Sequence, residues 1–197
     1  TEHIQIIEKR DERCQELKSK YGIKAGENLS TSDVALLVVK PQDLENLLTS
    51  IKGILPASAL VISFVAGKKI ESISEALGGK NPVIRVMPNT PALIGAGASA
   101  YSIGNGVDEH QIRFIKDLLG AAGKSVEVNE PLQDAVTATS GSGPAYFFAF
   151  VEAMIEGAKE LGLSEEVATE LTVQTFIGAA KLLESSGKSA KVLRENV

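Results

Sequence analysis

The sequence predicts an α/β protein in which a doubly wound parallel sheet is followed by an all-helical domain. Three apolar runs of strand length, Val34–Val39, Ala59–Val65 and Val83–Met87, alternate with segments of helical periodicity. Strands that alternate with helices of about 10 to 15 residues form βαβ units and therefore parallel sheets. After about residue 129 only helical patterns remain. We therefore predict a sheet domain over residues 1–128 and a helical domain over residues 129–197.

The sheet domain begins with a short apolar run, Ile4–Ile7, and a charged helical pattern from about Asp11 to Tyr21. Gly22 stands where a helix C-terminus favours glycine. Pro41 closes the strand at Val34–Val39. The other predicted elements of this domain are helices near 44–51, 70–77 and 108–122, and weaker strands at Ala98–Ser102 and Ser125–Val128.

Helices are predicted at about 131–139, 144–161 and 164–186, with a fourth beginning near Ala190. Ser164 is a plausible N-cap of the third. That helix carries Leu171 and Leu182 on one face, while Val173 and Ile177 lie on others. A helix that is apolar on nearly all faces must be buried, and a domain of about 65 residues offers too little to bury it. We expect a second copy of the chain to cover it, which makes a homodimer.

Composition narrows the classes of function. The 197 residues are 44% hydrophobic and 23% charged, with a formal charge of −5, as in an ordinary soluble globular protein. The sequence contains no basic stripe with interleaved aromatic residues, so no nucleic-acid partner is expected. It also contains no apolar run of the kind that forms a membrane span or a signal peptide. The single cysteine, Cys14, fits a reducing compartment, so we expect a cytoplasmic protein. No metal-ligand spacing or nucleophile–His–acid set is present, and no metal is expected.

Ligands of doubly wound sheets bind beyond the carboxyl ends of the strands. That rule selects Glu8-Lys9-Arg10, Lys40-Pro41, Ala66-Gly67 and Asn89-Thr90 together. Glu8 is suited to ribose hydroxyls, whereas Lys9 and Arg10 are suited to a 2′-phosphate, and the two cations favour NADP mildly over NAD. A solvated, charged helix start explains the first segment equally well.

A dinucleotide-binding sheet of the Rossmann type also needs a glycine fingerprint, which this sequence lacks. Gly141-Ser142-Gly143 imitates its first half, but it follows a helix, and Tyr146 stands where glycine is required. If Ile4–Ile7 is the second strand of the sheet, the fingerprint and the first βα unit lie upstream of Thr1. The absence of an initial methionine and the charged, helix-like end at Val197 also indicate that the chain is cut at both ends.

The run Ser140-Gly141-Ser142-Gly143-Pro144 separates two helices. We expect the glycines to turn the backbone sharply, Ser142 to cap the next helix and Pro144 to occupy its first turn. Such a helix start suits an anion or a carboxamide. A tight helix–helix connection is the equally weighted alternative. Glu130, Glu195 and Asn196 are isolated polar candidates that are surface residues by default.

These motifs together resemble the pyrroline-5-carboxylate reductase family. The matching runs are Val39–Asp43, Ala66-Gly67, Arg85–Leu93, Asp134–Tyr146, Gly178–Leu183 and Leu193–Val197. They occur in the family's order and cover essentially the whole chain. The resemblance implies reduction of (S)-1-pyrroline-5-carboxylate to L-proline with NADPH or NADH, the final step of proline biosynthesis. It also implies dimers interlocked through the helical domain, which can assemble into decamers of five dimers.

The same resemblance implies roles for individual residues. The cofactor would be bound by Glu8, Lys9, Arg10, Asn28, Val38, Val39, Lys40, Pro41, Ala66, Gly67, Asn89, Thr90, Pro91 and Asn196. The substrate site would be formed by Glu130, Ser140, Gly141, Ser142, Gly143, Pro144 and Glu195.

The family's loop that holds the substrate carboxylate would follow Val197, so no catalytic residue is assigned and the chain alone is expected to be inactive. Two alternatives to the reductase stay open. One is a paralogous imine or β-hydroxyacid reductase, and the other is a catalytically silent interaction protein of the same fold.

Overall fold

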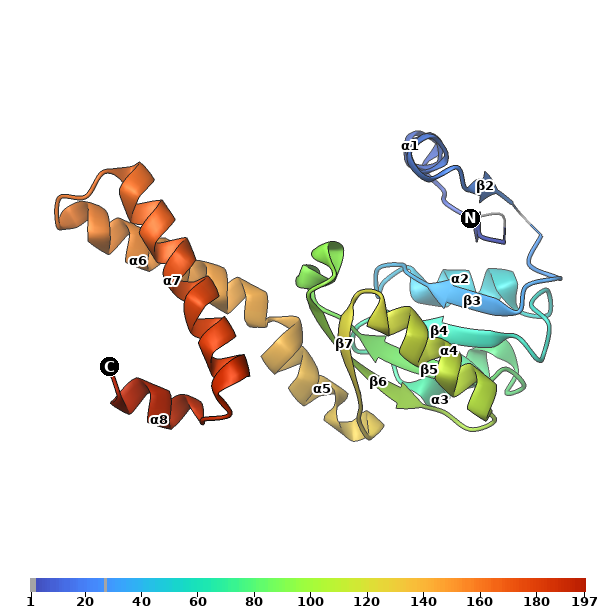
Figure 1. Cartoon of the computed structure of the whole chain (residues 1–197). Helices are drawn as coiled ribbons and strands as arrows, with labels where there is room; N and C mark the ends of the chain where they lie inside the picture. The colour runs from blue at the N-terminus through green and yellow to red at the C-terminus, as the bar shows by residue number, and fades with distance from the viewer. Residues whose placement is uncertain (1–2, 27) are drawn as a thin grey trace. The chain divides into compact units, whose positions relative to one another are not determined.

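The computed structural model describes residues 3–26 and 28–197, and the chain divides into two compact units, residues 1–137 and 138–197 (Figure 1). The boundary lies beyond the predicted one at 128/129. Residues 129–137 belong to the first unit because α5 (Gln133–Val136) packs on strand β6 (Gly97–Ile103), where the Gln133 side chain hydrogen-bonds Ser102.

The first unit is built on a five-stranded sheet in the order β3-β4-β5-β6-β7. Besides β6, the sheet contains β3 (Val34–Leu37), β4 (Leu60–Ser63), β5 (Val83–Met87) and β7 (Gly123–Glu127). Three of the four strand pairings are parallel, but β6 pairs with β5 antiparallel, so β6 and β7 run opposite to β3, β4 and β5. The prediction of a wholly parallel sheet is wrong at the β5–β6 pairing. The reason is the length of the connection, because a parallel crossover needs about a dozen residues or more, and the short 3-10 helix η1 (Thr90–Ile94) leaves room only for a reversal.

Helices cover both faces of this sheet, which confirms the doubly wound architecture. Helices α2 (Leu44–Ile51) and α3 (Ile70–Leu77) pack on one face with Val61 and Val83. Helix α4 (Glu109–Gly120) packs on the other face with Ile62 and Ile84. Side chains of successive strand residues point to opposite faces, and strands buried on both sides therefore read as the continuous apolar runs of the sequence.

The N-terminal segment forms a separate two-stranded parallel sheet from β1 (Gln5–Ile6) and β2 (Lys24–Ala25), connected by α1 (Asp11–Tyr21). Helix α1 ends as predicted, with Gly22 in the left-handed region at φ 63°. The condition considered for Ile4–Ile7, that it forms the second strand of the main sheet, is not met, since β1 is paired with β2 alone within the described residues. A two-residue strand makes few ladder hydrogen bonds and takes the partner that α1 brings beside it.

The second unit contains α6 (Gly143–Glu160), α7 (Glu165–Ser186) and α8 (Ala190–Glu195), entered through a π-helix, η3 (Thr137–Gly141). The expected sharp turn at Ser142 is wrong. Ser142 has helical angles, φ −85° and ψ −16°, and its side chain makes no cap hydrogen bond. Gly141 and Gly143 are not among the glycines with positive φ. The wide π turn carries the chain onward with helical backbone, so neither a reversal nor a side-chain cap is required.

Helices α6 and α7 pack together through aromatic contacts, with the ring centroids of Phe147 and Phe176 5.0 Å apart. Ser164 caps α7 as predicted, accepting a hydrogen bond from Val167 N. The pairing leaves Leu171 and Leu182 of α7 more than half exposed. The apolar surface that predicted a second copy is therefore still uncovered within this unit. No helix among the described residues is long and apolar enough to cross a membrane.

Candidate functional site

Three of the predicted strand-end segments lie at one edge of the sheet. Strands β3, β4 and β5 are adjacent and parallel, and Leu37, Ser63 and Arg85 share one register. Parallel strands in register end at the same edge. The structure therefore brings together Val38–Pro41, Ala66-Gly67 and Asn89–Pro91, one segment after each strand.

This edge is accessible. Val38 is 72% exposed, although it directly follows a strand of the sheet, and Lys40 is also exposed. Gly67 has φ +71°, and a side chain there would meet no atom within 4 Å. Glycine is needed at Gly67 for its backbone conformation, and the open space beside it permits a ligand to approach the main chain. These features fit a nucleotide laid across the strand ends.

Asn89 has a structural contact that the sequence did not reveal. Its side-chain Oδ1 accepts a hydrogen bond of 2.8 Å from the backbone N of Ala98, across the β5–β6 connection. Pro91 lies in the first turn of η1, and Thr90 is exposed. Asn89 thus closes the turn that presents Thr90 and Pro91 at the sheet edge.

Glu8 and Arg10 are engaged with each other. The Glu8 carboxylate accepts hydrogen bonds from Arg10 N, Nε and Nη2 at 3.0 to 3.2 Å. These bonds lower the pKa of Glu8 to about 2, with the Arg10 side chain as the largest cause. Ribose hydroxyls or a 2′-phosphate would therefore compete with an existing ion pair, whereas Lys9 is exposed and forms no ion pair within the described residues. Asn28 also has a local partner, since its Oδ1 accepts from Ser30 N and Oγ.

Glu130 is held inside the first unit. Its Oε1 accepts a 2.7 Å hydrogen bond from Ile70 N at the start of α3 and lies 3.4 Å from Nη1 of the buried Arg85. A helix N-terminus and a buried guanidinium both stabilise a carboxylate. Arg85 also reaches the exposed Asp134, with Nη2 3.5 Å from Oδ1. Glu130 therefore has two internal partners before any substrate is considered.

The remaining predicted residues belong to the second unit. Ser140, Gly141, Ser142, Gly143 and Pro144 are half-buried around the start of α6. Glu195 ends α8, with its carboxylate 3.8 Å from Arg194, and Asn196 follows it. The structure thus divides the predicted site residues into two groups, with the strand-end loops and Glu130 in one unit and these residues in the other.

A surface hollow of about 690 Å³ runs along α3. Among the described residues that line it, Glu130 is the one predicted site residue, and it lies beside Glu71, Glu75 and Lys80 of the α3 region. Within the described part of the chain, no three His, Cys, Asp or Glu side chains gather as metal ligands would.

Sequence reasoning missed the polar contacts of Arg85, Ser102 and Gln133. All three are buried, and Gln133 is completely inaccessible. The available signal was a charged residue inside the apolar strand V-I-R-V-M and a serine inside A-Y-S-I. Only the strand register shows that Arg85 and Ser102 lie opposite each other.

Comparisons with known proteins agree with this architecture. Residues 130–197 match the family described as pyrroline-5-carboxylate reductase dimerisation, and residues 1–67 match the family described as NADP oxidoreductase coenzyme F420-dependent. A pyrroline-5-carboxylate reductase from Corynebacterium melassecola is 40% identical, over all of this chain and 75% of its own length.

Solved structures give the same result. The pyrroline-5-carboxylate reductase of Coxiella burnetii is 32% identical with a TM-score of 0.89, over 98% of this chain and 74% of that one. The Plasmodium falciparum pyrroline carboxylate reductase, solved with NADP bound, is 28% identical with a TM-score of 0.85, over 98% and 71% of the two chains. With strand-end loops at one sheet edge, a dimerisation unit of helices and this identity across both units, the chain belongs to the pyrroline-5-carboxylate reductase family.

Proposed function

We propose that the protein reduces (S)-1-pyrroline-5-carboxylate to L-proline, the final step of proline biosynthesis, with NADPH or NADH as reductant. The observation that carries the proposal is the 40% identity to a reductase of this name across the whole chain, which includes every strand-end loop described above. In the reaction, a hydride adds to the C=N carbon of the cyclic imine and a proton is added to its nitrogen.

The cofactor is NADP in this proposal. A relative in the family carries NADP in its solved structure, and the match of residues 1–67 is to an NADP oxidoreductase family. When bound, the reduced nicotinamide supplies the hydride. The open sheet edge at Val38–Pro41 and Gly67 would hold the dinucleotide, with Thr90 and Pro91 beside its nicotinamide end. The exposed Lys9 is the first candidate for a 2′-phosphate, because Arg10 is already paired with Glu8.

On the substrate side, Ser140–Pro144 and Glu195 would line the imine site, and Asn196 would contact the cofactor. The work of these residues is to bind and orient, because holding two reactants in a productive geometry lowers the barrier without a covalent intermediate. Glu130 fits this group less directly, since its carboxylate already has internal partners. No residue of this chain is assigned as a general acid.

Members of the family associate through their helical domain, and this chain carries that domain at residues 130–197. The exposed apolar residues of α7 support a homodimer built through it. We further propose a decamer of five dimers, a cytoplasmic location, and a functional division into a cofactor domain at 1–128 and a dimerisation and substrate domain at 129–197.

The test is turnover by the full-length protein. Purified protein is mixed with pyrroline-5-carboxylate and either NADPH or NADH, and oxidation is followed at the nicotinamide absorbance. Substrate-dependent oxidation is expected with at least one cofactor. Absence of turnover with both, in protein shown to be folded and dimeric, would refute the proposal. Activity confined to open-chain acids would show a related reductase with another substrate.

A further inference from the structure

A row of three buried polar residues crosses the apolar sheet of the first unit. Ser63 of β4, Arg85 of β5 and Ser102 of β6 stand opposite one another in the strand register. Directly opposite residues share a face of the sheet, so the three side chains form one polar row. They are 0%, 5% and 1% exposed, on the same face as the apolar core around Val61 and Val83.

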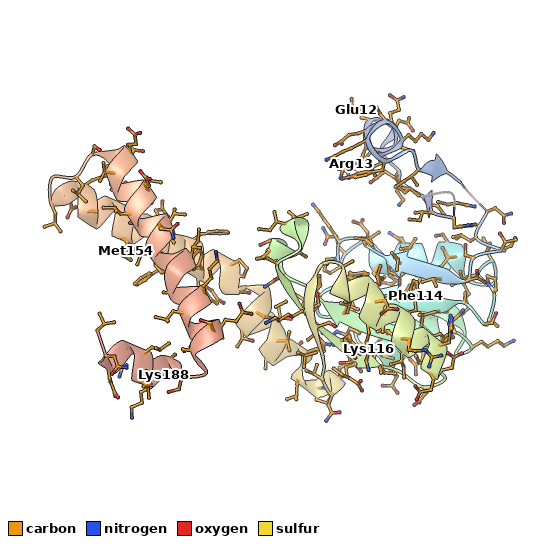
Figure 2. All side chains as sticks on the ribbon, in the orientation of Figure 1. Glu12, Arg13, Phe114, Lys116, Met154 and Lys188 are labelled. Carbon is orange, nitrogen blue, oxygen red and sulfur yellow. The ribbon has the colours of Figure 1, made fainter. Side chains whose placement is uncertain are left out.

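One short segment of the chain binds this row with polar side chains. Gln133 donates from Nε2 to Ser102 Oγ at 2.9 Å, and Ser102 Oγ donates to Val128 O at 2.7 Å. Arg85 binds Glu130 and Asp134, which flank Gln133 on either side. The segment 130–134 is therefore attached to the sheet at three points by polar contacts. Figure 2 draws the described side chains as sticks on the ribbon.

This attachment is costly. Gln133 is completely buried, and its Oε1 is the one buried side-chain oxygen or nitrogen without a hydrogen-bond partner among the described residues. Arg85 is a buried charge whose second partner, Asp134, is solvent-exposed. Apolar contacts of similar volume often stabilise a packed segment as much as such polar contacts do, because unsatisfied polar groups and buried ion pairs carry desolvation penalties. Polar contacts differ from apolar ones in fixing a single register and orientation.

The orientation of this segment matters because a π-helix begins shortly after it, at Thr137. Thr137 Oγ1 donates to Gln133 O at 2.9 Å, and the π-helix Thr137–Gly141 begins at that residue. A π turn is rare, and such turns occur frequently at functional sites. Its rotation about the helix axis is inherited from the residues that precede it. The placement of Gln133 on the sheet thus fixes the residue at which the π-helix begins.

We propose that Gln133 and Arg85 are positioning residues for the reductase reaction. They lock segment 130–134 on the polar row, at a cost in stability, and so fix the start of the π-helix that leads to Ser140–Pro144. This inference rests on the proposed function for its kinetic consequence, but the lock itself has a structural readout that does not depend on activity.

The experiment compares Gln133→Met with wild type in the full-length protein. Methionine keeps the length of the side chain and removes both the hydrogen bond to Ser102 and the unpartnered oxygen, so the two effects on stability offset each other. We expect a melting temperature within about 4 °C of wild type. We expect kcat to fall about tenfold with KM changed less than about twofold, because misplacement acts on the reactive geometry. Amide hydrogen exchange at residues 133–141 should become faster.

Asn81→Leu is the matched control. Asn81 is also a buried amide, and its Nδ2 donates to Pro56 O and Ala59 O, which lie outside segment 130–134. This variant should lose thermal stability while kcat stays at the wild-type value. If Gln133→Met does not fold, Ser102→Ala removes the same hydrogen bond with a smaller change and receives the same measurements.

Each outcome supports or overturns the positioning role. An active wild type with unchanged kcat in Gln133→Met overturns it. A loss of stability as large as that of Asn81→Leu, with kcat falling only in proportion to the folded fraction, shows that Gln133 is structural alone. An inactive wild type refutes the proposed function, and the exchange data then judge the lock separately. Unchanged exchange at residues 137–141 overturns the lock.

Discussion

Replacing Glu130 by glutamine separates the two roles open to this residue, substrate binding and internal support. The carboxylate accepts from Ile70 N at 2.7 Å and faces Arg85 Nη1 at 3.4 Å, with 27% of its side chain exposed. Glutamine can still accept from Ile70 N, but it no longer neutralises Arg85, whose side chain is 6% exposed. A charge-assisted bond contributes about 1.5–3 kcal/mol, and a buried cation without its partner adds a penalty. The exposed Asp134 offsets little of this.

We therefore expect Glu130→Gln to lower the free energy of unfolding of the first unit by about 2–3 kcal/mol. The assay is urea denaturation followed by a probe in the sheet domain, with unchanged m-value as the check for a single transition. The matched control is Glu75→Gln, an exposed glutamate of α3, the helix whose first residue, Ile70, donates to Glu130, and a change within about 0.5 kcal/mol is expected there. KM for the imine should stay near wild type. A loss below about 1 kcal/mol together with a large rise in KM would refute this reasoning and favour direct substrate binding.

Three further predictions concern the Glu8–Arg10 ion pair, the sheet and the start of α6. Arg10→Gln should raise the pKa of Glu8 from about 2 towards its ordinary range, measured by NMR titration. A depressed carboxyl pKa stabilises the fold above the unfolded pKa and loses that effect as pH falls towards 2, so wild type and variant should differ at neutral pH and converge in acid. Gly123→Ala should lower the free energy of unfolding by about 2–4 kcal/mol in denaturant, because φ is +141° and the new Cβ would overlap the backbone of Gly97. A loss below about 1 kcal/mol would show that the β6–β7 edge can shift. Gly143→Val should reduce kcat more than it reduces thermal stability. Little stability is lost because the φ of Gly143 is not positive and the added Cβ meets no atom within 4 Å. Equal losses of both would assign this segment to architecture alone.

Much of the fold follows from local patterns. The runs at β3, β4 and β5 are continuous and apolar because each strand is buried on both faces, and alternation with helices then implies parallel pairing. Gly22 and Ser164 mark helix ends by chemistry that acts within a few residues. The antiparallel β6 could be anticipated only from connection length. The π-helix could not be read from Ser140–Pro144, because glycine and proline indicate a turn without stating its hydrogen-bond pattern.

For the candidate site too, some features could be predicted from the sequence and others could not. The sequence placed Lys40-Pro41, Ala66-Gly67 and Asn89-Thr90 at strand ends, and the sheet brings them to one edge. It could not show that Asn89 bonds Ala98, that Arg10 occupies Glu8, or that Arg85 holds Glu130. Those pairings join residues through space, and their partners carry no mark in the local pattern.

By itself, the sequence determined the two-part architecture, the strand-end segments, the need for apolar cover on α7 and the family, because periodicity and motif order are properties of the chain. The tertiary structure alone decided which polar side chains are engaged. Register sets Arg85 opposite Ser63 and Ser102, and packing brings Glu130 and Gln133 onto that row. A buried polar group must find its partner in three dimensions, and the free energy of that match depends on distances that no linear pattern records.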